Sequence, residues 1–221
     1  MTMKKWIAIA AGAGAMMAAS PLSAQQPKDH WSGFYAGLNA GGIWNTTSAG
    51  VSVSNGPGGG LAGSGGGFMG GAQAGYNYLF GPVLLGGEVD FQGSTLSSNL
   101  SGLVGPSNVN ATGTMPWFST FRARLGYNLG SVVPYVTGGA VWGNERLSGF
   151  DTVNGSFNAS SNFWTYTFGA GMEGHLNDQW SAKLEWLWVG TPDTQLSTPA
   201  STGISERSIG DIVRVGLNYK F

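Results

Sequence analysis

Charged residues spaced two apart are the part of this sequence that could carry chemistry. Glu88 and Asp90 form one such pair, and Arg122 and Arg124 form another. Because side chains i and i+2 of a β-strand lie on one face, two neighbouring carboxylates could serve a hydrolase as acid and base. With two arginines on the next predicted strand, we expect these carboxylates instead to be counter-ions in buried ion pairs, where an unpaired charge is costly.

The remaining candidates for catalysis or ligand binding are weaker. His30 and His175 are the only histidines, and the chain has no cysteine, so the sequence predicts neither a metal site nor a nucleophile with its base. A lipid esterase would need a serine, a histidine and an acid that converge near the bilayer edge, and we can name no such partner for His175. The glycine-rich run 56–67 lacks the Lys-Ser/Thr of a phosphate-binding loop. We therefore predict no catalytic residue, no cofactor and no metal ion.

The composition favours a membrane protein built from strands. Only 10% of the 221 residues are charged, 42% are hydrophobic and nine are tryptophan, whereas soluble domains carry about 25% charged residues. Beyond the N-terminal segment, no apolar run reaches the roughly 20 residues that a spanning helix needs. Strands with one apolar and one polar face satisfy both observations. The 39 glycines would weaken helices but suit turns, loops and crowded barrel interiors.

The N-terminal segment, residues 1–24, is predicted to be a cleaved secretory signal. An early lysine pair precedes an apolar and small-residue stretch over residues 6–19, and the small residues that follow favour cleavage between Ala24 and Gln25. A retained membrane anchor is the alternative, which the shortness of the apolar run disfavours.

The mature chain is predicted to consist of a short periplasmic linker over residues 25–30 and one barrel domain over residues 31–221. It keeps eight basic residues and all eleven acids. Its formal charge is therefore about −3, which is too weak and too scattered to favour nucleic acid as a partner.

Eight segments of the mature chain alternate apolar and polar residues. They span residues 31–45, 68–80, 83–92, 115–127, 132–144, 163–175, 180–188 and 211–221. A period of two is typical of strands whose faces meet different surroundings, and about ten alternating residues per strand is the pattern of a transmembrane barrel. The sequence thus predicts an all-β fold, an eight-stranded antiparallel transmembrane β-barrel. The fifth segment fits least well, because Tyr135 and Val141 are apolar at interior positions.

The charged residues within these segments test that assignment. All nine share the parity of the interior, and none falls on the predicted lipid face: Glu88, Asp90, Arg122, Arg124, Glu173, Lys183, Glu185, Arg214 and Lys220. A Lys or Arg at the midplane of a barrel's lipid face costs about 2–4 kcal/mol. We therefore predict that these residues form a lumen charge network. An ion or proton path along them is the alternative, which a lumen filled by side chains disfavours.

The connections between segments alternate between tight turns and long stretches rich in Ser, Thr, Asn and Gly. The long stretches, residues 46–66, 94–113, 145–161 and 190–209, are predicted to be extracellular loops, and the tight turns and both termini are predicted to be periplasmic. The tryptophans near strand ends are predicted to form an interfacial girdle rather than a ligand site. These are Trp164, Trp180, Trp186 and Trp188.

Three blocks of the sequence, residues 31–37, 177–186 and 213–221, resemble the porin-like outer-membrane β-barrel proteins of alphaproteobacteria, which include proteins called outer-membrane immunogenic proteins. The resemblance implies an eight-stranded barrel that the outer-membrane assembly machinery inserts after recognising a final strand ending in Phe221, with Tyr219 and Leu217 before it. Some relatives are credited with haem binding or surface interactions, and no catalytic set comes with the fold.

The function predicted from these observations is that of a structural, surface-exposed barrel with a filled lumen, which contributes to envelope integrity and surface interaction. Its predicted partners are outer-membrane lipids and lipopolysaccharide and the assembly machinery, and it is predicted to be a monomer because a closed barrel has no free edge. The alternatives are a narrow channel, a haem-binding surface receptor, or a soluble carrier resembling a lipocalin.

Overall fold

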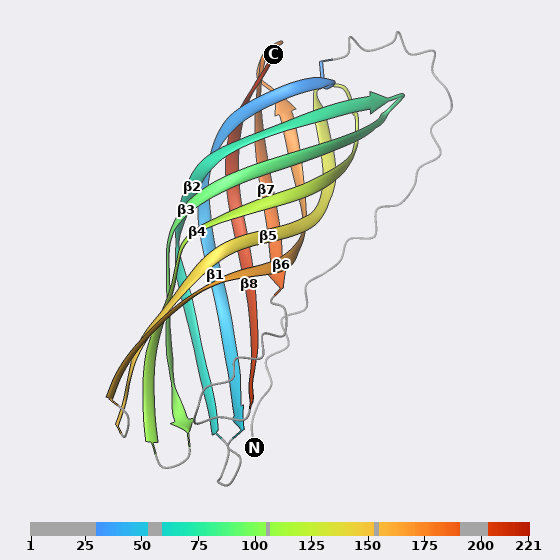
Figure 1. The fold of residues 1–221 in the computed structure, drawn as a ribbon. Coiled ribbons are helices and arrows are strands. Elements are labelled where there is room, and N and C mark those ends of the chain that lie inside the picture. Colours follow the sequence, from blue (N-terminus) through green and yellow to red (C-terminus); the bar gives the residue numbers. More distant parts are fainter. Residues whose placement is uncertain (1–29, 53–58, 105–106, 153–154, 191–202) are drawn as a thin grey trace, which may run out of the picture.

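The computed structural model describes residues 30–52, 59–104, 107–152, 155–190 and 203–221, and these form eight β-strands (Figure 1). The strands are β1 Gly33–Ser52, β2 Gly59–Phe80, β3 Val83–Val104, β4 Ser107–Tyr127, β5 Val132–Asp151, β6 Gly155–His175, β7 Trp180–Gly190 and β8 Gly203–Lys220. The described residues include no helix long and apolar enough to cross a membrane. The predicted signal segment, with its cleavage site between Ala24 and Gln25, lies outside the described residues.

Each strand pairs antiparallel with its neighbours in sequence order, and β8 closes the ring on β1. Leu38 and Leu217 are partners across this closing seam. The predicted eight-stranded antiparallel barrel is confirmed. The tight turns and the end of β8 lie at one end of the barrel, and we call this the turn side; the other end, where long hairpins project from the wall, is the hairpin side (Figure 1).

The strands are longer than predicted, because they continue through most of the stretches that were expected to be loops. β1 runs on to Ser52, β3 to Val104 and β5 to Asp151, whereas alternation ends near Asn45, Gln92 and Asn144. The reason is physical: hydrophobic alternation marks only the part of a strand that has lipid on one face. Beyond it both faces meet water, and backbone pairing continues without that pattern.

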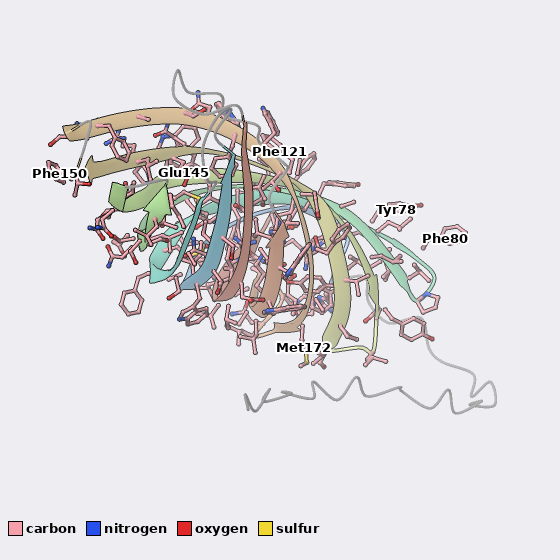
Figure 2. The ribbon with its side chains drawn as sticks, turned by 90° about the horizontal axis from the view of Figure 1, so that it is seen from below. Tyr78, Phe80, Phe121, Glu145, Phe150 and Met172 are labelled. Atoms are coloured by element: carbon pink, nitrogen blue, oxygen red, sulfur yellow. The ribbon has the colours of Figure 1, made fainter. Side chains whose placement is uncertain are left out.

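The two faces of the wall differ as predicted. Large apolar side chains such as Phe168 and Leu125 point outward and are 58% and 50% exposed, and Figure 2 shows Phe121 and Met172 pointing away from the wall. Tyr135, which blurred the alternation of the fifth segment, is buried inside the barrel.

A bulge in β4 changes which residues face the interior. The register with β5 shifts between Thr114 and Trp117. On one side of the shift Val109 and Ala111 are buried, and on the other side Phe118 and Thr120 are buried, so the interior parity switches from odd to even. Pro116 lies within the shifted stretch, as expected for a residue that cannot donate to the ladder.

The closing seam gives a direct test of the barrel's closure. The chain has no native cysteine, and cross-strand partners lie within the Cα separation that a disulfide spans. We expect Leu38→Cys/Leu217→Cys to form a disulfide in the folded barrel, detected as a change of gel mobility after boiling without reductant. Leu38→Cys/Leu125→Cys, which joins β1 to the distant β4, is the control and should form none. A cross-link in the control but not in the seam pair would contradict the topology.

Candidate functional site

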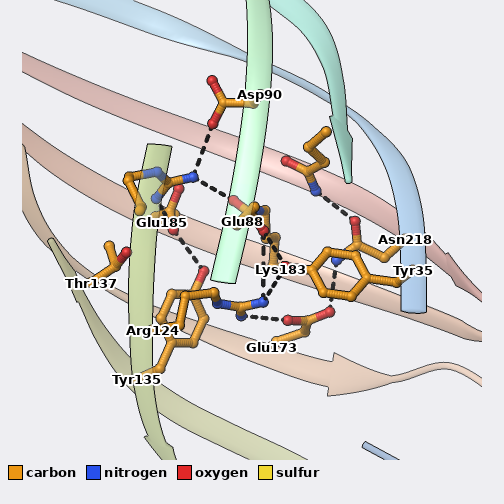
Figure 3. A network of polar contacts seen from close by, with 12 residues as sticks. Tyr35, Glu88, Asp90, Arg124, Tyr135, Thr137, Glu173, Lys183, Glu185 and Asn218 are labelled. Atoms are coloured by element: carbon orange, nitrogen blue, oxygen red, sulfur yellow. Dashed lines mark hydrogen bonds and ion pairs between the residues drawn. The ribbon is translucent and has the colours of Figure 1, made fainter. Parts of the chain in front are cut away.

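Eight of the nine charged residues predicted to share the lumen lie together in one cluster, which we call the ionic layer. Figure 3 shows part of it, around Glu88 and Lys183. It consists of Glu88 and Asp90 from β3, Arg122 and Arg124 from β4, Glu173 from β6, Lys183 and Glu185 from β7 and Arg214 from β8. None of the eight is more than 4% exposed. The layer holds four cations and four anions and is therefore neutral overall.

Glu88 is the centre of the ionic layer. Lys183 Nζ lies 2.7 and 2.8 Å from its two carboxylate oxygens, and Arg122 donates to the same carboxylate. The hydroxyl of Tyr35 donates to Glu88 Oε2 at 2.7 Å. The second guanidinium of β4, that of Arg124, lies 3.6 Å from Glu88. This one carboxylate thus holds together groups from β1, β4 and β7.

Arg122 and Arg214 share the two remaining acids of the centre. Arg122 lies 3.0 Å from Asp90 and 2.8 Å from Glu185. Arg214 lies 3.0 Å from Asp90 and 2.6 Å from Glu185. β3 is not a neighbour of β8, and β4 is not a neighbour of β7. The Arg214–Asp90 and Arg122–Glu185 pairs therefore cross the lumen, whereas the other two pairs join neighbouring strands.

Arg124 and Glu173 form the turn-side edge of the layer, 2.6 Å apart. Glu173 Oε1 also accepts hydrogen bonds from Ser181 at 2.6 Å and Asn218 at 2.7 Å. The guanidinium of Arg124 lies 4.0 Å from the centroid of the Tyr135 ring, in a cation–π geometry. Hydrogen bonds to Glu173 and the ring face of Tyr135 therefore add to the ion pair, while Nε of Arg124 is buried without a hydrogen-bond partner.

Two tyrosines of the layer fit because a glycine faces each of them. A Cβ on Gly75 would collide with the Tyr35 ring and hydroxyl, and a Cβ on Gly171 would lie 2.6 Å from the Tyr135 ring. Tyr135 donates to Glu185 Oε1 at 3.0 Å. The sequence predicted an interior position for Tyr135 but no partner for it. One sequence signal marks both sites: an interior tyrosine lies opposite an interior glycine on a neighbouring strand, as Tyr35 does with Gly75 and Tyr135 with Gly171.

An apolar layer crosses the lumen on each side of the ionic layer. The hairpin-side apolar layer takes one buried residue from each of seven strands: Ile43, Met69, Leu96, Phe118, Val141, Leu187 and Ile212. The turn-side apolar layer consists of Trp31, Leu84 and Val133, and Trp31 Nε1 donates to the carbonyl of Gly130 at 3.1 Å. These residues were not predicted as a group. The charges thus lie between two apolar clusters, and at the turn-side mouth Glu173 also borders a small pocket lined by His175 and Lys220.

Lys220 lies apart from the ionic layer, partly exposed at the turn-side mouth, because it is the last residue of β8. His30 and His175 lie at the same mouth with their ring centroids 5.5 Å apart. His30 Nδ1 is 3.6 Å from the exposed Asp178. Within the described part of the chain, no three His, Cys, Asp or Glu residues are placed to hold a metal ion.

The predicted assembly signal lies on the outer face of the final strand. Leu217 is 42% exposed and Phe221 is 79% exposed. The Tyr219 ring contacts those of Trp180 and Phe221, with centroids 5.1 and 5.4 Å away. The three side chains therefore lie on the outer surface of the barrel wall, near the end of β8.

The sequence matches a family model described as "Outer membrane protein beta-barrel domain" over residues 7–221. The chain belongs to this family. It is 34% identical to the 31 kDa outer-membrane immunogenic protein of Brucella melitensis over 215 residues, which covers 91% of this chain and 88% of the relative. It is 28% identical to a 22 kDa outer membrane protein of Rhizobium leguminosarum bv. viciae, covering 89% and 81%. The predicted family resemblance is confirmed, and the protein is a cell outer-membrane protein.

Solved structures agree on the fold. The outer membrane protein OprG of Pseudomonas aeruginosa superposes with a TM-score of 0.51 at 14% identity, covering 87% of this chain and 97% of that one. The outer membrane protease OmpT of Escherichia coli superposes with a TM-score of 0.53 at 11% identity, covering 85% and 96%. Likeness at this level of identity concerns the barrel fold alone.

The ionic layer predicts a large effect of removing its central carboxylate. We expect Glu88→Ala to lower the free energy of unfolding by about 3–5 kcal/mol, because it leaves buried cations without a partner. Urea titration of the barrel in lipid vesicles measures this. Asp178→Asn removes an exposed partner of His30 and should cost less than about 1 kcal/mol. An equal loss of unfolding free energy in Glu88→Ala and Asp178→Asn would show that water reaches the ionic layer, which would contradict its burial.

Proposed function

We propose that this protein is a structural, surface-exposed outer-membrane barrel that does not conduct, and that it contributes to envelope integrity and surface interaction. The observation that supports this most directly is the layered lumen. An ion that crossed it would have to pass Leu187 and Phe118, which are 0% and 1% exposed, then the ion pairs of the ionic layer, and then the turn-side apolar layer. A filled eight-stranded barrel has no room for a continuous water column.

The proposed orientation places the turn side in the periplasm and the hairpins outside the cell. It is supported by the asymmetry between tight turns and long hairpins that outer-membrane barrels share. On the hairpin side of the apolar belt, Trp117, Trp142 and Trp164 form a chain of ring contacts with centroids 5.0 and 5.9 Å apart, as expected at a membrane interface. In this orientation the outward side chains of Leu217 and Phe221, near the end of β8, lie toward the periplasm and the assembly machinery.

We propose a non-enzymatic role. The likeness to a protease concerns the fold alone, and the relatives named above are described as an immunogenic protein and an outer membrane protein. Both histidines of the sequence lie at the turn side, far from the hairpins, which disfavours haem capture at the cell surface through a histidine ligand. Glu88 and Asp90 are held by arginines and a lysine, so neither is placed as a general base.

Conductance in planar bilayers tests the closed lumen. We expect the wild-type barrel to give no steady conductance above the leak of the bilayer. Leu187→Ser/Ile212→Ser changes a cross-strand pair of the hairpin-side apolar layer and should give brief openings, because polar groups let water into the seal. The matched pair Leu184→Ser/Val215→Ser faces outward on the same strands and should stay silent.

The outcome that contradicts the proposal is a steady conductance of the wild-type protein. Gel mobility before and after boiling shows which variants are folded, and only folded protein is compared.

A further inference from the structure

The barrel is closed, but its extension on the hairpin side has an unpaired strand. β6 pairs with β5 along almost its whole length. β7 is shorter and ends at Gly190, so its pairing with β6 stops at Thr167 (Figure 1). On the side that faces away from β5, residues 155–164 of β6 pair with no strand of the described chain. We call this side of residues 155–164 the open edge.

The backbone groups that point to the open edge belong to the even-numbered residues. The amide of His175 donates to the carbonyl of Ser131, next to β5, at 3.0 Å. The side chain of Asn144 on β5 donates to the carbonyl of Ser161 at 3.4 Å. Both odd-numbered residues thus face β5. Because these groups alternate in direction along a strand and the register with β5 has no shift, the N–H and C=O groups at the open edge are those of Ser156, Asn158, Ser160, Asn162 and Trp164.

The open edge lacks the features that keep exposed edges from pairing. Natural edge strands carry charged residues, proline or a bulge. Residues 155–164 include no charged residue and no proline. The rings of Phe157 and Phe163 lie over Gly149 and Gly143 of β5, so they lean away from the open edge and do not cover it. Another extended chain can therefore add a strand here.

The sequence disfavours the chain's own continuation as that strand. Extending the β6–β7 register beyond Gly190 would place Pro192 opposite Trp164. The ladder needs an N–H donor at this position, and proline has none. A second copy is disfavoured as well. Two copies cross the membrane in the same direction, whereas antiparallel pairing of their β6 strands would require one copy to be inverted.

We propose that the open edge binds an extended segment of another protein outside the cell, which adds a strand antiparallel to β6. The side chains beside the edge indicate its pattern. Asn158 and Ser160 are exposed on the outward face, and Phe157 and Phe163 are partly exposed on the inward face. A segment that alternates hydroxyl or amide side chains with apolar ones fits both faces. The inference names a partner for the surface interaction of the proposed function and rests on the proposed orientation.

The experiment measures binding of a labelled peptide to the folded full-length barrel in detergent, by fluorescence anisotropy. The probe is as long as the open edge, alternates valine and threonine, and carries N-methyl groups on its valines. One edge of the probe can then pair, and the other cannot, which prevents self-assembly. The control is the same peptide N-methylated at every residue. We expect saturable binding of the probe and none of the control.

A matched pair of variants tests the same point from the side of the protein. Asn158→Pro/Ser160→Pro removes two N–H groups from the open edge and leaves the N–H groups that face β5 in place. We expect it to weaken binding of the probe about tenfold, since each lost hydrogen bond weakens it several-fold. Asn158→Ala/Ser160→Ala keeps both N–H groups and should bind within about threefold of the wild type. Gel mobility before and after boiling shows which variants are folded, and the two peptides decide the question on the wild type even where a proline variant does not fold.

Binding of the fully methylated peptide as tight as that of the probe would overturn the proposal, as would equal affinity of the wild type and a folded Asn158→Pro/Ser160→Pro. Binding that requires replacement of residues 191–202 by a Gly-Ser linker would identify the chain's own segment as the occupant. A wild-type dimer that the proline variant abolishes would identify a second copy. Either result refutes the proposal.

Failure of the proposed function is distinguishable from these outcomes. A steady conductance of the wild type would refute the closed lumen and leave the peptide binding untouched. Protection of the hairpins from protease added to intact cells would refute the orientation, and with it a partner outside the cell.

Discussion

The burial of eight charges in the lumen requires every charge to be paired, and this requirement shapes the barrel. Removing a single ion from water costs several kcal/mol, so Glu88 is surrounded by Lys183 and Arg122 within hydrogen-bonding distance, and by Arg124 and Arg214 at 3.6 Å. A barrel wall alone joins each strand only to its neighbours. The ion pairs add links across the lumen, from β3 to β7 and β8 and from β4 to β6 and β7.

The apolar layers make these links strong and also close the lumen. Attraction between charges grows as the surroundings become less polar, and the hairpin-side layer separates the charges from the outer solvent with residues such as Phe118 and Leu187. The same side chains fill the space through which water or ions would pass. In the proposed non-conducting barrel, stability and the closed lumen therefore have a common cause. The hairpins beyond the seal are free to carry the surface chemistry of the protein.

The sequence predicted the parts of this structure that lipid dictates. Every charged residue of the ionic layer falls on the interior parity because a charge on the lipid face is costly, and the tight turns mark the strand ends. The hairpin extensions were missed because residues such as Asn99 and Ser148 face water, where no alternation is required. The switch of parity in β4 was missed because a bulge at Pro116 depends on the register with β5. The apolar layers were not predicted, because in the sequence Ile43 and Ile212 are isolated apolar residues at interior positions. Only the strand register shows that they lie at one level of the lumen.

The central claim is that the charges of the ionic layer are sealed from water. Hydrogen exchange of the arginine side chains, followed by NMR after transfer of the folded barrel into deuterated buffer, tests it most directly. Arg146, exposed on a hairpin, serves as an internal reference. The guanidinium protons of Arg122 and Arg214 should persist long after those of Arg146 have exchanged. Exchange of all three at the same rate would show a wet lumen and would contradict the account.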